Sequence, residues 1–144
     1  MLKVLNPVMR TMLRSRLGRK MNSLMVLGFT GRKTGHRYDI PVMAHRTRGE
    51  LFVLTGAPWR HNFDEGRDVE VTLEGEKTPM HAVPLTEPRE IAAVYTRRIN
   101  ELGIKDAQRQ IGIKINVPRL PTDEEITDAV SRQHLTAIRL DPRP

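Results

Sequence analysis

Short runs of alternating apolar and polar residues, separated by turns that contain glycine or proline, make up much of the first half of the chain. Runs of about four to eight residues with this period are typical of half-buried β-strands. The predicted strands cover residues 24–29, 37–44, 51–55, 69–73 and 78–84, and a last one covers 135–140. Because few residues separate most of them, we expect neighbouring strands to be joined as antiparallel hairpins.

A helical period replaces the strand period in the second half of the chain. Apolar residues recur three and four positions apart over 87–102, where Pro88 stands in the expected first turn and Gly103 follows the end. Another helix is predicted to begin after Thr122, because Thr122 and Glu125 have the spacing of a capping box.

A short helix is expected over 58–66, since Pro58 stands near its start and Gly66 at its end. The segment 105–115 has no comparably clear period. The resulting order is a helix, five strands with one short helix inserted, further helices and a final strand. This order predicts an α+β, mainly β fold: a small barrel or closed sheet of about six mostly antiparallel strands with flanking helices.

The first twenty residues combine helical spacing with positive charge. Apolar residues recur along one side and arginines lie between them: Leu2, Leu5, Met9, Met12 and Leu13, with Arg10, Arg14 and Arg16. We therefore divide the chain into a basic amphipathic helix over 1–20 and a barrel domain over 21–144. Two interpretations stay open: the helix contacts an anionic membrane surface as a peripheral element at the inner face, or it is an ordinary docking helix with a solvated basic face.

The formal net charge of +7 is concentrated at the amino-terminal end of the chain. Residues 1–38 contain nine cations and no acid, whereas the rest of the chain carries 15 cations and all 17 acids. With that balance, and with only 4% aromatic residues, a nucleic-acid partner is not expected. The chain has no cysteine, which excludes disulfides and thiolate metal sites and agrees with a cytoplasmic location.

Few side chains are arranged for acid–base or nucleophilic catalysis. The five histidines are His36, His45, His61, His81 and His134. They show no metal-ligand spacing, and we interpret them as surface or hydrogen-bonded residues. The sequence contains no nucleophile elbow, Walker loop or Rossmann glycine pattern. If the protein is an enzyme, we expect a bound cofactor to carry the reaction, while the protein supplies binding, orientation and exclusion of water.

Two glycines bracket a pair of cations between the first two predicted strands. The sequence there is Thr30-Gly31-Arg32-Lys33-Thr34-Gly35. Glycine permits a tight turn, such a turn exposes backbone N–H groups, and arginine and lysine add positive charge. The segment therefore suits a phosphate or a carboxylate. The alternative is a solvated hairpin turn that is merely basic.

This turn and several later segments, taken together and in order, resemble one protein family. Residues 27–35 are similar to the T-T-G-R-K-S/T-G signature of the deazaflavin-dependent nitroreductase family of actinobacteria. The segments that follow in the family's order are Ile40-Pro41-Val42, Thr55-Gly56-Ala57-Pro58, Trp59-Arg60-His61-Asn62-Phe63, Val69-Glu70-Val71 and Ala137-Ile138-Arg139-Leu140-Asp141-Pro142. The ordered set is more specific than any one segment.

The resemblance implies a split β-barrel like that of flavin-mononucleotide-binding oxidoreductases. It implies coenzyme F-420, an 8-hydroxy-5-deazaflavin, as hydride donor, with flavin mononucleotide as the less favoured cofactor. Gly31, Arg32, Lys33, Thr34 and Gly35 would hold the phosphate and acidic tail of F-420. Pro41, Val42, Thr55, Gly56 and Ala57 would line the deazaflavin ring, with Trp59 and Asn62 closing the site. Taken by itself, Trp59 either walls a pocket or anchors the core. No catalytic side chain is assigned, and a homodimer is expected by analogy with this type of barrel.

Two departures from the family pattern leave the electron acceptor open. Relatives that reduce nitroimidazoles carry a lysine and glycines where this chain has Ala57-Pro58, and a tyrosine-rich segment that residues 100–134 lack. The function predicted is hydride transfer from reduced F-420 to an electron-poor small molecule such as a quinone, an enone or a nitro compound. The alternative is a non-catalytic binder of a flavin, haem or fatty acyl ligand in the same pocket.

Overall fold

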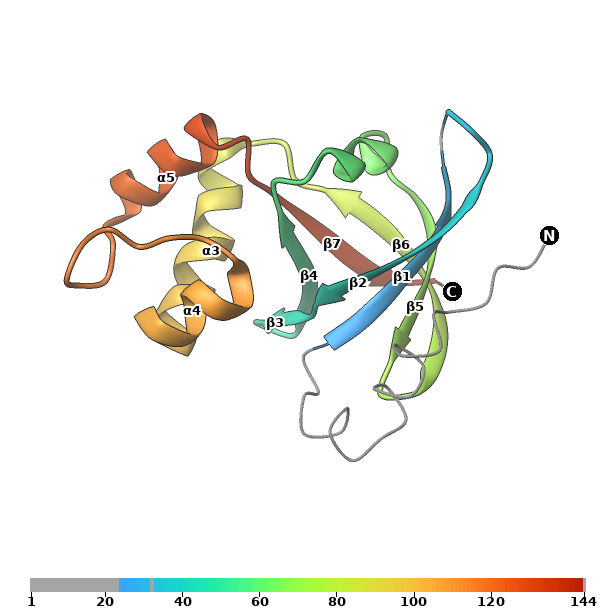
Figure 1. The fold of residues 1–144 in the computed structure, drawn as a ribbon, viewed down its shortest axis with the longest axis horizontal. Coiled ribbons are helices and arrows are strands. Elements are labelled where there is room, and N and C mark those ends of the chain that lie inside the picture. The colour runs from blue at the N-terminus through green and yellow to red at the C-terminus, as the bar shows by residue number, and fades with distance from the viewer. Residues whose placement is uncertain (1–23, 32, 144) are drawn as a thin grey trace.

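The computed structural model describes residues 24–31 and 33–143. The helix predicted over 1–20 and the residue Arg32 lie outside this part of the chain. Within it, one antiparallel sheet curls around a core, and the longer helices gather on one side of the sheet (Figure 1).

Seven strands make up the sheet in the described part of the chain. They are β1 (Leu24–Thr30), β2 (Arg37–Met43), β3 (His45–Thr47), β4 (Glu50–Thr55), β5 (Arg67–Leu73), β6 (Glu76–Pro84) and β7 (Thr136–Pro142). Hydrogen bonds order them as β2-β1-β5-β6-β7-β4-β3, and all pairs are antiparallel. The pairs β1–β2, β3–β4 and β5–β6 are hairpins between chain neighbours, as the short connections predicted. Strand β7 lies between β6 and β4 and joins the two halves of the sheet.

The sheet curls so that its two edge strands, which follow each other in the chain, come close together. β2 and β3 are the edges of the sheet, yet only Ala44 separates them in the sequence. Among the described strands, no hydrogen-bonded pair joins β2 to β4, so the barrel has an open seam between these two strands. This arrangement confirms the predicted split β-barrel.

The strand predicted over 37–44 extends one residue too far and hides a further strand. β2 ends at Met43, and His45 to Thr47 form the separate strand β3 against β4. His45 and Thr47 are buried although they are polar. A hydrophobic period cannot identify such a strand, because its inward residues are not apolar. The other strands agree with the predictions to within two residues at either end.

The barrel interior is filled by apolar side chains that alternate along the strands. Met25, Leu27 and Phe29 on β1 belong to this cluster, as a period of two requires. Leu51 and Val53 on β4 belong to it as well, whereas the residues between them do not. The curled sheet therefore has one dry inner face.

The helices form a second layer against the outer face of β4 and β7. They are α3 (Pro88–Leu102), α4 (Ile104–Ile111) and α5 (Asp123–Arg132), and the short 3-10 helix η1 (Pro58–Phe63) lies apart from them beside the β1–β2 turn (Figure 1). Phe52, Leu54 and Ala137 join the helices in a second apolar cluster. No helix in the described part of the chain has the length and apolar character needed to cross a bilayer.

The capping box predicted at the start of α5 is present. The Glu125 N–H donates to the Thr122 hydroxyl at 3.2 Å, and the Thr122 N–H donates to the Glu125 carboxylate at 2.9 Å. The segment that showed no clear period contains α4, which is only eight residues long.

Candidate functional site

The turn between β1 and β2 uses its two glycines for different reasons. Gly35 has a φ of 73°, which glycine adopts without strain, and its N–H donates to the Gly31 carbonyl at 3.0 Å. Gly31 instead allows a close approach, because a Cβ atom there would lie 2.5 Å from the ring of Tyr38. Among the described residues, the N–H groups of Lys33 and Thr34 have no backbone acceptor. These two amides are therefore available to an anion.

A cleft of about 510 Å³ lies beside this turn, and we call it the turn cleft. It is lined by Phe29, Gly31, Lys33, Thr34, Tyr38, Ile40, Pro58, Trp59, His61 and Asn62. Of the residues predicted to bind the cofactor, Gly31, Lys33, Thr34, Trp59 and Asn62 come together here. Gly35 closes the turn but does not line the cleft.

A second hollow of about 320 Å³ lies in the open seam of the barrel, and we call it the α4 hollow. β2 forms one wall, β4 another, and the carboxyl end of α4 a third. It is lined by Pro41, Val42, Met43, Val53, Leu54, Thr55, Trp59, Arg109, Gln110, Ile111 and Gly112. Pro41, Val42 and Thr55 were predicted to line the cofactor ring and Trp59 to close the site, and the seam brings these four together.

Trp59 lines both hollows, which therefore lie next to each other at this side chain. Its ring meets Phe63 edge-on with a centroid distance of 6.0 Å. Phe63 is fully buried and contacts Phe29 at a centroid distance of 4.8 Å. Trp59 therefore fits both interpretations drawn from the sequence, since it walls a pocket and packs against the barrel core.

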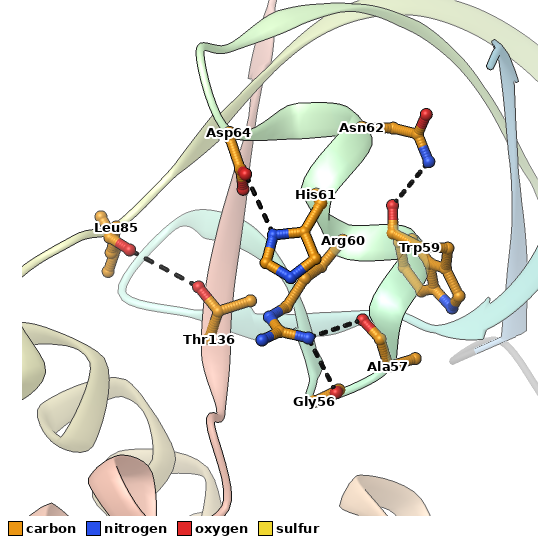
Figure 2. Close-up of polar contacts among 9 residues, drawn as sticks. All are labelled: Gly56, Ala57, Trp59, Arg60, His61, Asn62, Asp64, Leu85 and Thr136. Atoms are coloured by element: carbon orange, nitrogen blue, oxygen red, sulfur yellow. Dashed lines mark hydrogen bonds and ion pairs between the residues drawn. The ribbon is translucent and has the colours of Figure 1, made fainter. Parts of the chain in front are cut away.

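The loop after β4 is fixed by hydrogen bonds of its own. The Thr55 hydroxyl accepts from the Ala57 N–H at 3.0 Å. Arg60 Nη1 donates to the carbonyls of Gly56 and Ala57 at 3.0 and 3.1 Å (Figure 2). Gly56 and Ala57 thus shape the loop that carries Trp59, but they line neither hollow.

The polar side chains of η1 contact neighbouring residues of the same segment. Asn62 Nδ2 donates to the Trp59 carbonyl at 2.9 Å, and His61 Nδ1 lies 3.0 Å from Asp64 Oδ2 (Figure 2). His81 similarly pairs with an aspartate at 2.8 Å on the sheet. These contacts agree with the interpretation of the histidines as surface or hydrogen-bonded residues. Within the described ranges, no group of three or more potential ligands could hold a metal ion.

Tyr38, Arg109 and Gln110 are among the lining residues of the two hollows that were not identified from the sequence. Tyr38 lines the turn cleft, with its hydroxyl 3.3 Å from that of Thr34. Arg109 and Gln110 line the α4 hollow from a helix whose segment showed no clear period. The available signal was the pair of glycines that bracket this helix, because Gly112 ends it in the left-handed conformation.

Among the residues that the structure describes, none that lines the turn cleft or the α4 hollow is acidic. Lys33 stands in the first, which therefore favours an anionic ligand, whereas Arg109 in the second is paired with Asp106 at 2.6 Å. A larger hollow of about 810 Å³ lies between α3 and α5, where arginines stand beside acids such as Asp123 and Glu124. In that hollow the positive charges are balanced by acids, so it has no preference for an anion. We therefore assign the candidate site to the turn cleft and the α4 hollow.

The fold and these hollows define a split-barrel protein with a cation-bearing site suited to an anionic organic ligand. Residues 5–120 match the family model of the F420H(2)-dependent quinone reductases. The chain belongs to this family and is an F420-dependent oxidoreductase. The family confirms the deazaflavin class to which the sequence motifs pointed, and it is named for quinones as acceptors.

Solved structures share the fold at low sequence identity. The heme storage protein HutZ from Vibrio cholerae is 15% identical with a TM-score of 0.51, and the match covers 99% of this chain and 92% of that one. A structure described as a domain-swapped dimer is 12% identical with a TM-score of 0.50, covering 83% and 80%. The F420-H2 dependent reductase FDR-A is 16% identical with a TM-score of 0.49, covering 83% and 94%. No curated protein matches the chain.

The residues present fit an F-420 cofactor, whose tail is acidic and whose ring is flat and largely apolar. The turn cleft offers Lys33 and two backbone N–H groups without opposing acids. The α4 hollow offers apolar walls such as Val42 and Val53, with Gln110 as a polar group at one side. Convergent polar groups beside apolar walls are the usual features of cofactor sites.

Substitution of Gly35 by alanine is expected to lower the free energy of unfolding by about 1 kcal/mol, because alanine resists the positive φ. No atom of the described residues lies within 4 Å of the added Cβ, so the expected cost is conformational. Gly75→Ala is a matched control, since Gly75 has a φ of 83° and equally open space in the β5–β6 turn. Chemical denaturation should show similar losses for both variants, whereas only Gly35→Ala should also weaken F-420 binding. Equal F-420 affinity in both variants would argue against a role of the turn geometry.

Proposed function

We propose that this protein reduces a small electron-poor acceptor, namely a quinone, an enone or a nitro compound, with F420H2 in a single site formed by the two hollows. When bound, F420H2 supplies a hydride ion. In this proposal Arg32, Lys33 and Thr34 hold the acidic tail in the turn cleft, while the seam between β2 and β4 holds the ring. The observation that carries the proposal is the position of Trp59, which lines both hollows and so places them next to each other.

The protein's own part in this reaction is binding, orientation and partial exclusion of water. Val42 and Val53 present apolar walls from the two sides of the seam, which favours a flat ring between them. Gln110 lies at the third wall, where its side-chain amide can donate a hydrogen bond to an acceptor oxygen as it gains negative charge, and Arg109 beside it is paired with Asp106 at 2.6 Å. One hydride and one proton reduce the acceptor, and water supplies the proton. Holding both reactants in a productive geometry is then the main catalytic contribution.

The direct test mixes the purified protein with F420H2 and a panel of quinones, enones and nitroaromatic compounds. Oxidation of the cofactor is followed by its absorbance, and its affinity is measured by equilibrium titration beside flavin mononucleotide and haem. Turnover with at least one acceptor class supports the proposal. Tight binding of F420H2 without turnover across the panel would favour a passive binder, and preferential binding of haem, flavin mononucleotide or a fatty acyl ligand would contradict the assigned cofactor.

Thr55→Ala and Asn62→Ala are expected to lower the rate by less than about tenfold each. Neither side chain is proposed as a nucleophile or an acid, and each instead fixes a loop. Thr55 accepts from the Ala57 N–H and Asn62 donates to the Trp59 carbonyl. Their loss should displace the ring slightly and cost a modest factor in rate. Steady-state kinetics with a saturating quinone measures the effect, and a loss of more than a thousandfold in a folded variant would indicate direct chemistry.

We also propose a cytoplasmic protein that contacts an anionic membrane surface through residues 1–20. The motive is their six cations without an acid on an amphipathic pattern. A chain lacking these residues should no longer sediment with anionic vesicles at low salt, yet should keep its affinity for F-420. Full-length protein that never binds such vesicles would leave the segment as a docking helix.

For the assembly we infer a homodimer, supported by the split-barrel fold and by the neighbour that is described as a domain-swapped dimer. Light scattering over a range of concentrations measures the mass in solution. A monomeric mass at all concentrations would contradict the inference.

A further inference from the structure

His45 is a buried histidine close in sequence to a residue that lines the α4 hollow. It is only 1% exposed and begins β3, two residues after Met43, which lines the hollow. His45 itself lines neither hollow. Any influence on the site must therefore pass through residues that it contacts.

Both ring nitrogens of His45 have hydrogen-bond partners on different helices. Nδ1 accepts from Arg98 Nε of α3 at 3.2 Å, and the ring also bonds the Gln110 backbone on α4. Because an arginine always donates, Nδ1 carries no proton, and the Nε2–H donates to the Gln110 carbonyl. Arg98 is held in turn by Glu101 at 3.2 Å. Burial and the charge of Arg98 lower the pKa of His45 to about 4, so the ring is neutral near pH 7.

The Gln110 carbonyl lies in the last turn of α4, where carbonyl groups have no partner within the helix. The Gly112 N–H donates to the Gln108 carbonyl at 3.1 Å, and His45 supplies the donor for the Gln110 carbonyl. In the eight residues of α4 only Ala107 and Ile111 are buried. So short a helix has little stability of its own, and its position depends on such contacts.

We propose that His45 is a positioning residue of the α4 hollow: it joins α3 to the last turn of α4 and so holds Arg109 and Gln110 at the seam opposite Trp59. This inference rests on the proposed function, because the α4 hollow is there the site of the cofactor ring. His45 acts through Gln110 and not by contact with cofactor or acceptor.

Three variants separate this role from simple burial. His45→Phe keeps an aromatic ring of similar size but removes both the acceptor and the donor. His45→Gln retains one acceptor and one donor and should therefore rescue. His81→Phe is the matched control, since His81 is an exposed histidine on β6 that lines neither hollow.

The first readout needs no cofactor. In His45→Phe, amide hydrogen exchange over 104–112 should rise at least tenfold, while 91–99 in α3 keeps its protection. Acrylamide quenching of Trp59, the only tryptophan, should increase as the opposite wall loosens. His45→Gln should return both values close to those of the unaltered protein, and His81→Phe should change neither. Unchanged exchange over 104–112 in a folded His45→Phe variant would overturn the proposal.

The second readout is kinetic and separates this inference from the proposed function. We expect kcat to fall about tenfold in His45→Phe, with the Kd for F420H2 changed less than about threefold because the turn cleft is intact. Loosened exchange over 104–112 with unchanged kcat and KM would overturn the assignment of the α4 hollow as the ring site. Should His45→Phe fail to fold, the ¹⁵N shifts of His45 in the unaltered protein decide: a neutral ring protonated on Nε2 at pH 7 supports the link, and any other form overturns it.

Discussion

Replacing both cations of the β1–β2 turn, Arg32→Ala with Lys33→Ala, is expected to weaken F-420 binding by roughly 2–4 kcal/mol, or about 30-fold to 1,000-fold in Kd. Lys33 lines the turn cleft, and no acid among the described residues of its walls competes for the charge. The assignment of Arg32 rests on the sequence, where it stands beside Lys33 between two glycines. Isothermal titration at constant ionic strength measures the loss, because screening by salt would otherwise change the result.

A variant with the same change of net charge at other places provides the control. Arg48→Ala with Lys77→Ala removes two cations that line neither the turn cleft nor the α4 hollow. That control should lose only a small, salt-dependent part of the affinity, through the weaker field of the whole protein. If the turn variant is folded and binds F-420 as tightly as the control does, the turn is not the tail site.

The sequence predicted the parts of the site that lie on one hairpin or one loop. The turn between Thr30 and Arg37 follows from two glycines and two alternating runs, and local geometry decides the conformation of such a turn. Pro58 likewise marks the start of η1. Trp59 and Asn62 then come to the cleft because this short helix follows β4 directly.

The α4 hollow could not be predicted in the same way, because its walls come together only through the closure of the sheet. Val42 and Val53 belong to strands that are not hydrogen-bonded neighbours, and their proximity depends on the order of all seven described strands. Gln110 adds a wall from a helix whose two buried residues give too weak a period. His45 is polar, so a hydrophobic pattern predicts that it lies outside the core. In the structure it is buried, because its hydrogen bonds satisfy the ring.

The folded protein is expected to lose roughly 2–3 kcal/mol of stability between pH 7 and pH 4.5 through His45 alone. Burial, with the adjacent charge of Arg98, lowers the pKa of His45 from 6.5 to about 4. As the pH falls below 6.5, the unfolded chain takes up a proton on this histidine while the folded chain does not. The free energy of unfolding therefore decreases through this window and levels off below about pH 4.

Urea denaturation at several pH values measures the effect, and His45→Gln is the reference because its side chain does not titrate. The charged groups near the imidazole of His45 are Arg98, Glu101 and Arg97. Arg98 donates to the ring, Glu101 accepts from Arg98 and from the Thr47 hydroxyl, and Arg97 donates to that hydroxyl. The exposed histidine–aspartate pairs elsewhere are common to both proteins and cancel in the difference. The unaltered protein should lose about 2–3 kcal/mol more than His45→Gln between pH 7 and pH 4.5. Parallel stability curves for the two proteins would mean that His45 titrates normally, and the neutral link between α3 and α4 would then be wrong.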